Sequence, residues 1–362
     1  VLAVLKFIAG DETAVTRYFD RANERKGLEA LAQSMAAIAE GDARTARQKA
    51  QRAERLLKRP HVTRLINAQA FEMSGDMQKA RGYYKALADD SDTSFVGVSG
   101  LMRIARAEGD RETALILART AAGLRSGHAE TLEALYTLQS EAYDWQGARV
   151  TLDAQKRANL LDEAEVKRRD SMLVLAQAAD AEEAGQDGDA LKHAVDAAKI
   201  DPSNPEAVEK AARMLAATNG VRQATKLIAD AWKTAPSARL ARVYADLAPD
   251  ETPEERRKRF AELFSSNPGA PESHYARAEL AIAEGDYAAA REALGKVEQT
   301  DPPARYCALM AAVIRGEGGP ESDVRSWLAK GVTAPRGNPE DAPVDDLLRA
   351  AIVGSPDGGG SD

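Results

Sequence analysis

A fold made only of α-helices, stacked as helical hairpins, is predicted by three observations on this 362-residue chain. An acidic turn returns every 34 residues, with an aspartate at Asp42, Asp76, Asp110 and Asp144. An alanine lies four residues after each of these, at Ala46, Ala80, Ala114 and Ala148. The alternation of β-branched and polar residues that is typical of strands is missing. Such a regular pattern indicates a repeat protein in which neighbouring units bury each other's apolar faces.

Each residue type in the pattern has a physical reason. A glycine before the aspartate, as at Gly41, adopts the positive φ that ends the first helix. The aspartate caps the first free N–H groups of the second helix. The alanine lets the two helices approach closely, and a proline such as Pro202 or Pro236 marks the end of a unit because it cannot continue a helix. A 34-residue helix-turn-helix period is that of the tetratricopeptide repeat, so we expect a right-handed superhelical solenoid of about nine units.

The pattern shifts by eight residues after Leu160 and then continues. A longer first helix over Glu163–Glu183 accommodates the extra residues, because this stretch contains neither proline nor glycine. The seventh unit is the least regular, with helices expected over 237–247 and 254–264. In the fourth unit, Trp145 stands where the other units have their glycine-aspartate turn. The expected units are 27–60, 61–94, 95–128, 129–162, 171–204, 205–236, 237–270, 271–304 and 305–337.

The repeats define the expected organisation of the chain. Residues 1–26 are a membrane-proximal segment or first helix, 27–162 hold units one to four, and 163–337 hold units five to nine. Residues 338–362 are rich in Gly, Pro, Ser and Asp and are expected to form an acidic flexible tail. Within this tail, residues 344–353 have the pattern of a short helix.

The N-terminal residues allow two interpretations. Residues 1–8 are apolar except for one lysine, but they are far fewer than the ~20 residues that span a bilayer. A basic stretch follows, with Arg17, Arg21, Arg25 and Lys26. The chain either begins inside or just after a membrane helix, or starts with an amphipathic helix that packs onto the solenoid. In the first case the basic flank places the solenoid on the cytoplasmic side by the positive-inside rule.

Charge is unevenly distributed around a net value of −8. Residues 43–64 contain eight Lys or Arg and one acid, Glu54. This run is either a solvated helix face or a surface that attracts an anionic membrane or an acidic partner. Nucleic acid is not an expected partner, because the whole chain is acidic and no aromatic residues alternate with the bases.

The sequence contains no group of residues with the spacing expected of a catalytic or metal site. The histidines His61, His128, His193 and His274 lie in different units, and each is expected to be a surface or packing residue. The single cysteine, Cys307, excludes an intramolecular disulfide and stands among Ala and Leu residues, as a small buried side chain does. We therefore predict no catalytic residues, no metal site and no cofactor.

The first helices of successive units line the inner surface of such a superhelix, where a protein partner would bind. Counting from the aligned alanines places the following residues near that surface: Gln69, Glu72, Arg103, Arg106, Glu133, Arg213 and Glu279. Arg103 and Arg106 are three residues apart and either bind a carboxylate together or are merely solvated.

Several segments resemble one bacterial family. Residues 26–32 (KGLEALA), 37–42 (AIAEGD) and 53–57 (AERLL) look like the start of the soluble region of HemY-type proteins. Residues 232–236 (WKTAP), 244–247 (YADL), 307–310 (CALM) and 327–330 (WLAK) are similar to the alphaproteobacterial branch. The resemblance covers residues 1–337 and rests on the order of these segments along the chain.

The resemblance implies an inner-membrane protein with two N-terminal membrane helices and a tetratricopeptide body that faces the cytoplasm. It also implies a non-catalytic scaffold in late heme biosynthesis, with enzymes of that pathway as partners. The flavoprotein oxidase that shares the family's name is not implied, because no Gly-x-Gly-x-x-Gly motif opens a strand-helix unit. Two alternatives remain open: a soluble adaptor for envelope assembly or secretion, and a heme or porphyrin carrier.

Overall fold

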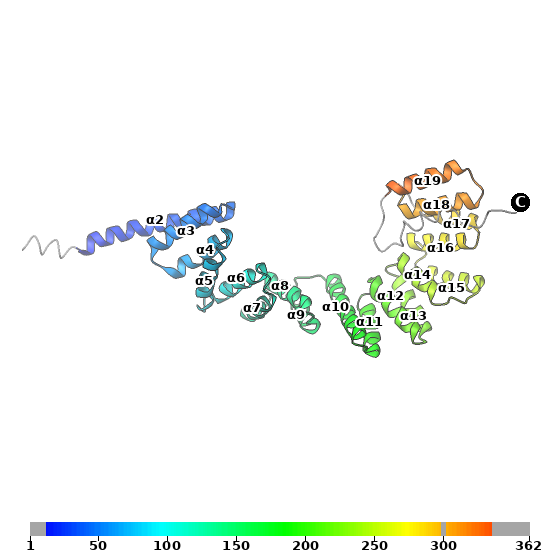
Figure 1. The fold of residues 1–362 in the computed structure, drawn as a ribbon, viewed down its shortest axis with the longest axis horizontal. Helices are drawn as coiled ribbons and strands as arrows, with labels where there is room; N and C mark the ends of the chain where they lie inside the picture. Colours follow the sequence, from blue (N-terminus) through cyan, green and yellow to red (C-terminus); the bar gives the residue numbers. More distant parts are fainter. Residues whose placement is uncertain (1–11, 298–301, 335–362) are drawn as a thin grey trace, which may run out of the picture. The chain divides into compact units, whose positions relative to one another are not determined.

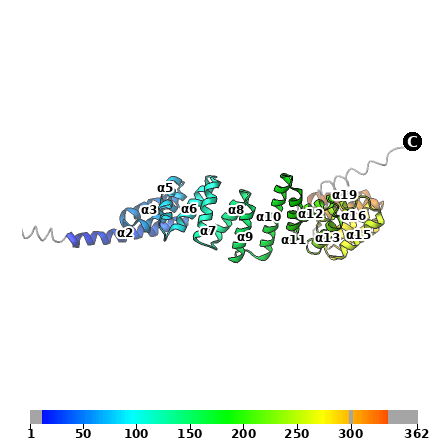
Figure 2. The same cartoon turned by 90° about the horizontal axis from the view of Figure 1, so that it is seen from below.

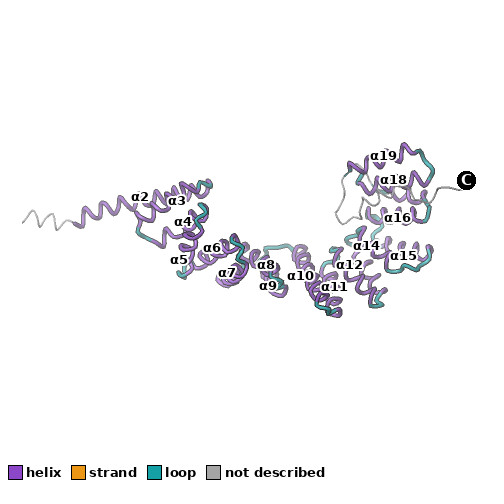
Figure 3. The backbone as a smooth tube through the Cα atoms, viewed as in Figure 1, coloured by secondary structure: helices purple, strands orange, loops and turns teal. Residues whose placement is uncertain are grey.

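The computed structural model describes residues 12–297 and 302–334, with side chains from residue 21 onward, and throughout this part of the chain the regular structure is helical (Figure 1, Figure 3). The predicted all-α fold of paired helices is confirmed. The apolar residues 1–8, the tail 338–362 and the short helix expected at 344–353 lie outside the described residues.

The chain divides into two compact units between Asp162 and Glu163. The first contains α2 (Glu12–Glu40), α3 (Ala43–Leu57), α4 (Pro60–Met73), α5 (Met77–Ala88), α6 (Ser94–Ala107), α7 (Arg111–Leu124), α8 (Ala129–Glu141) and α9 (Trp145–Arg157). The second contains α10 (Glu163–Glu183), α11 (Asp187–Ile200), α12 (Pro205–Ala217), α13 (Val221–Trp232), α14 (Ala238–Asp246), α15 (Pro253–Ser265), α16 (Pro271–Ala283), α17 (Tyr287–Gly295), α18 (Ala304–Gly316) and α19 (Glu321–Thr333).

These helices form hairpins, each made of an even-numbered first helix and the odd-numbered second helix that follows it (Figure 1, Figure 2). The long helix α10 has the bounds expected for the fifth unit, Glu163–Glu183. The seventh hairpin, α14 and α15, lies within one residue of the expected helices. Helix α2 begins at Glu12 and runs without a break past residue 26, where the sequence suggested a segment boundary.

The turn between α4 and α5 shows how the hairpins close. Gly75 has a φ of +79°, which side chains with a Cβ rarely adopt. The carboxylate of Asp76 then accepts a hydrogen bond of 3.2 Å from the backbone N–H of Lys79 and caps α5. Hydrogen bonds from the Lys79 side chain and backbone hold the pKa of this carboxyl below its usual value. The same two roles recur at Gly41 and Asp42, Gly109 and Asp110, and Gly285 and Asp286.

Two turns differ from the prediction. In the fourth hairpin Tyr143, not a glycine, has the positive φ of 58°, and Asp144 still caps α9 through the N–H of Gly147 at 3.0 Å. Trp145 is therefore the first residue of α9 and does not replace the turn; its ring lies 5.5 Å from that of Tyr143. In the sixth hairpin Asn219 takes the positive φ, because asparagine tolerates this conformation, and the glycine after it is the N-cap.

The position four residues after each N-cap, which we call the alanine slot, is buried in almost every described hairpin. In eight of the nine hairpins it holds a small apolar residue that is 0% exposed. These residues are Ala46, Ala80, Ala114, Ala148, Ala190, Ala224, Ala290 and Val324. The seventh hairpin is the exception: its N-cap is Thr252, so the slot is occupied by Arg256.

The seventh hairpin is packed by aromatic side chains. Trp232 is fully buried at the end of α13, and its indole N–H donates a hydrogen bond of 3.0 Å to the Ser273 hydroxyl of α16. Phe260 and Phe264 of α15 and Tyr244 of α14 join the same apolar cluster. Helices α14 and α15 approach each other less closely than the two helices of each other described hairpin.

Gly75 and Gly82 provide a matched test of the turn geometry. Neither has an atom that an added Cβ would meet, but Gly75 has a positive φ and Gly82 lies inside α5. We expect Gly75→Ala to lower the free energy of unfolding by about 1 kcal/mol, because alanine is strained there. Gly82→Ala is expected to raise it by about 0.5–1 kcal/mol, because alanine favours the helix. Urea denaturation followed by helical circular dichroism measures both, and changes of the same sign would contradict the assignment.

Candidate functional site

Two of the residues expected on the partner-binding surface of the first unit bind each other. Arg103 of α6 donates from Nε and Nη2 to the Glu72 carboxylate of α4, at 3.2 and 3.1 Å. Its Nη2 also donates to the Tyr84 hydroxyl at 2.9 Å. Burial and the neighbouring Glu72 raise the pKa of Tyr84, which keeps the phenol protonated. Arg103 is thus held by a carboxylate of its own chain.

The neighbouring predicted residues are arranged differently. Arg106 lies one turn further along α6 and is exposed, and its side chain has no hydrogen bond or ion pair with another described residue. Gln69 of α4 is half-buried. Glu133 of α8 is exposed and accepts a hydrogen bond of 2.8 Å from the Gln155 amide. Arg106 is therefore the side chain of this set that remains available to bind a carboxylate from outside.

The second unit repeats this pairing between first helices. Arg213 of α12 forms ion pairs with Glu209 at 2.9 Å and with Asp246 of α14 at 3.3 Å. Glu279 of α16 accepts a hydrogen bond of 2.9 Å from Nε of Arg305 in α18, whose side chain is only 4% exposed. Burial opposes the charge of Arg305, but the carboxylates of Glu279 and Glu272 outweigh it and raise the pKa of the guanidinium.

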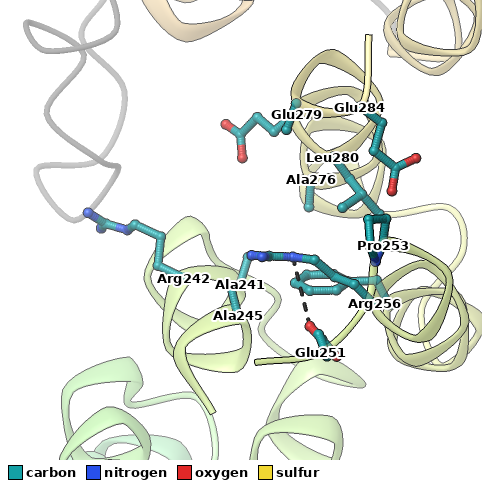
Figure 4. Close-up of a pocket in the computed structure, with 12 residues that line it drawn as sticks. Ala241, Arg242, Ala245, Glu251, Pro253, Arg256, Ala276, Glu279, Leu280 and Glu284 are labelled. Carbon is teal, nitrogen blue, oxygen red and sulfur yellow. Dashed lines mark ion pairs between the residues drawn. The ribbon is translucent and has the colours of Figure 1, made fainter. Parts of the chain in front are cut away.

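A cavity of about 400 Å³ lies between α14, α15 and α16, all in the second unit (Figure 4). Its apolar wall includes Phe260, Ala276 and Leu280, and its polar lining includes Arg256 and Glu284. The predicted residue Glu279 lies at its edge. A second hollow of similar volume between α12 and α14 contains the predicted residue Arg213.

The cavity is explained by Arg256, which occupies the position that holds alanine or valine in the other described hairpins. An arginine cannot fill a space that fits alanine, so the two helices of the seventh hairpin stand apart at Arg256. The connection between α14 and α15 also spans six residues, 247–252, whereas α4 and α5 are joined by only three, 74–76. The cavity was not predicted from the sequence. The signal that could have indicated it is Arg256, an arginine at the position where most other units have alanine.

A group of exposed bases lies at the outer end of the first hairpin. Gly27 of α2 lies against Leu57 of α3, and Glu24 forms an ion pair of 3.1 Å with Arg59. This contact brings the predicted residues of α2 beside the end of α3. We call the exposed residues Arg21, Arg25, Lys26, Arg55, Lys58 and Arg59 the N-terminal basic cluster. Arg17 belongs to the same helix α2, in the part whose side chains are not described.

The histidines and the cysteine lie apart from one another. His128 caps α8, His274 is buried, and burial together with Arg277 and Lys296 lowers the pKa of its imidazole. Cys307 is fully buried, as predicted. Among the described residues no group of three or more His, Cys, Asp or Glu is placed to hold a metal ion. Within the same part of the chain, no helix combines the length and the apolar composition that crossing a bilayer requires.

The first part of the chain is similar to one protein family. Residues 1–75 match the family model described as the HemY protein N-terminus. These 75 residues of the 362 are similar to the HemY N-terminal region. The resemblance to HemY proteins is therefore confirmed over residues 1–75, which include α2, α3, α4 and the N-terminal basic cluster. No curated protein matches the sequence.

Solved structures with helical repeats are similar at low identity. A tetratricopeptide repeat protein from Parabacteroides merdae is 16% identical over 74% of this chain and 98% of its own, with a TM-score of 0.33. Yeast Tom70 is 12% identical over 95% of this chain and 94% of its own, with a TM-score of 0.37. The TPR2AB domain of yeast Sti1, solved in complex with pHSP90, is 15% identical over 84% and 98%, with a TM-score of 0.30. Scores this low add nothing to what the hairpins themselves establish.

Arg103 and Arg106 differ in pairing although they share helix α6. We expect Arg103→Ala to lower the free energy of unfolding by about 1–2 kcal/mol, because it removes charged hydrogen bonds that are partly shielded from solvent. Arg106→Ala is expected to change it by less than about 0.5 kcal/mol, because the side chain is exposed and unpaired. Urea denaturation of both variants checks this, and equal effects would show that the Arg103 contacts are not stabilising.

Proposed function

We propose that this protein is a non-catalytic scaffold that binds protein partners along the first helices of its hairpins and is associated with heme biosynthesis. The HemY N-terminal match supports the association with this family. The observation that carries the scaffold proposal is how the polar side chains are used: they cap helices and pair between hairpins, as at Glu72 and Arg103 or Glu279 and Arg305. Such a framework holds a surface rigid, which suits binding.

The positions of the candidate nucleophile and bases also support a binding role. Cys307 is fully buried and His274 is mostly buried, whereas a reacting side chain must reach a substrate. His61 is exposed on α4 and His128 caps α8, so the histidines do not converge on one another. The enzymes of tetrapyrrole synthesis are the partners that the family association points to.

Affinity capture from native bacterial membranes tests this proposal. We expect the wild-type chain to recover enzymes of tetrapyrrole synthesis. Arg106→Glu should reduce recovery at least about 10-fold, since the loss of one charged contact at an interface is worth about 1.5 kcal/mol or more. Lys85→Glu is the charge-matched control, because Lys85 is exposed on the second helix α5 and should leave recovery unchanged. Recovery of envelope or secretion proteins without tetrapyrrole enzymes would contradict the association with heme biosynthesis and favour the adaptor function instead.

We also propose that the first hairpin lies against the cytoplasmic face of the inner membrane. The N-terminal basic cluster gathers six exposed bases at the end of this hairpin that is nearest the N-terminus. An anionic bilayer attracts juxtamembrane bases by about 1 kcal/mol for each Lys or Arg near its surface. The basic cluster would then orient the hairpins that follow it toward partners in the cytoplasm.

Vesicle flotation tests the membrane orientation. We expect binding to vesicles that contain phosphatidylglycerol and little binding to pure phosphatidylcholine. The double variant Arg55→Gln, Lys58→Gln should bind about 30-fold more weakly at low salt, since it removes two bases worth about 1 kcal/mol each. Lys192→Gln with Lys199→Gln, two exposed lysines of the second unit, is the matched control. Equal loss in both double variants would mean that net charge, and not the basic cluster, drives binding.

A further inference from the structure

Two buried polar atoms in the cavity of the seventh hairpin lack a hydrogen-bond partner among the described residues. They are Nε of Arg256 and Oε1 of Glu284. The other oxygen of Glu284 accepts from Nη1 of Arg257 at 3.1 Å. An unsatisfied buried donor or acceptor costs about 1–3 kcal/mol, so both atoms favour a ligand that completes their hydrogen bonds.

The acid nearest to Arg256 is already engaged. Glu251 lies 3.9 Å from Nε of Arg256, which is too long for a hydrogen bond. Both oxygens of Glu251 accept hydrogen bonds from Arg259. Figure 4 shows the Arg256 side chain crossing the cavity toward Ala241 and Ala245 of α14, while Arg242 points away from it. Nε of Arg256 thus forms this long ion pair, drawn as a dashed line in Figure 4, but donates no hydrogen bond to a described residue, and an acceptor in the cavity would complete it.

The chemistry of the lining selects the class of ligand. One free donor and one free acceptor match the carbonyl and the N–H of a peptide backbone. Phe260 and Leu280 offer an apolar surface for a side chain, and 400 Å³ lies within the range of ligand pockets, about 300–1,000 Å³. Three acids, Glu251, Glu279 and Glu284, line the cavity against two arginines, which disfavours a carboxylate or phosphate as the group bound.

We propose that this cavity is an anchor site for an extended, uncharged peptide segment with an aliphatic side chain. Arg256 donates from Nε to a peptide carbonyl, and Glu284 accepts from a peptide N–H. The aliphatic side chain packs against Phe260 and Leu280. The anchor rests on the proposed scaffold function, because the segment would belong to a protein partner, and it deepens that function by naming where the partner is held.

Two substitutions in α15 test this site, one in the cavity and one outside it. Arg256→Ala places in the slot the residue found in most of the other hairpins, so the variant is expected to fold with a thermal midpoint no lower than that of the wild type. It removes the donor and lets the helices close. Lys258→Ala, an exposed residue two positions along α15 that does not line the cavity, is the matched neutral change.

The probe is N-acetyl-L-leucine N-methylamide, which carries one aliphatic side chain between two peptide groups. Titrated into the full ¹⁵N-labelled chain, it should cause saturable amide shifts confined to α14, α15 and α16. N-Acetylglycine N-methylamide should bind at least about 10-fold more weakly, because it lacks the side chain that would be buried. Arg256→Ala should weaken leucine-probe binding by at least about 10-fold, and Lys258→Ala should not change it.

Two results would overturn the anchor: no saturable shifts with the leucine probe, or equal affinity for the wild type and Arg256→Ala. Equal binding of the glycine probe would also overturn it, because a water-filled polar site would not distinguish the two. This failure is separable from failure of the scaffold function. The probe uses no natural partner, so membrane capture with the wild-type chain could still succeed, and probe binding could persist if capture recovered nothing.

Discussion

The close approach of two helices at one slot in each hairpin is the constraint on which the rest of the structure depends. A residue four positions after the N-cap is buried between the helices, and alanine or valine there is 0% exposed. The caps and turns on either side fix where that residue falls, since Asp76 and Gly75 set the start of α5 and therefore the position of Ala80. Where the slot instead holds Arg256, the helices separate and a cavity opens.

Charge pairing between successive first helices is the second organising feature. The chain contains 49 bases and 57 acids, enough to make a strongly charged surface, yet many of them neutralise each other locally. Arg305 shows the principle: its guanidinium is almost wholly buried because Glu272 and Glu279 both bind it. Among the described residues Arg106 has no acidic partner, and in the N-terminal basic cluster six bases face a single acid, Glu24, which pairs with Arg59. These are the groups through which the surface is expected to attract other molecules.

The candidate site was only partly predictable, for a reason that particular residues make clear. Counting along the repeat placed Glu72, Arg103 and Glu279 on first helices, and the structure has them there. The same counting gave no sign that Arg103 binds Glu72, because the two lie 31 residues apart and meet only when hairpins stack. The positive φ of Tyr143 could not be predicted for a different reason. A tyrosine in the left-handed region costs roughly 1–2 kcal/mol, and only the surrounding hairpin imposes this conformation.

The sequence by itself determined the helical hairpins, their approximate number and, except for the start of α2, their bounds to within a few residues, together with the capping aspartates and the buried alanines. These are local features, set by φ preferences, side-chain capping and the size of one residue, and they repeat so that each unit confirms the others. Tertiary structure alone decided which charges pair and where space remains. Ion pairs such as Glu279 with Arg305, and the cavity beside Arg256, depend on distances between helices that are far apart in the chain.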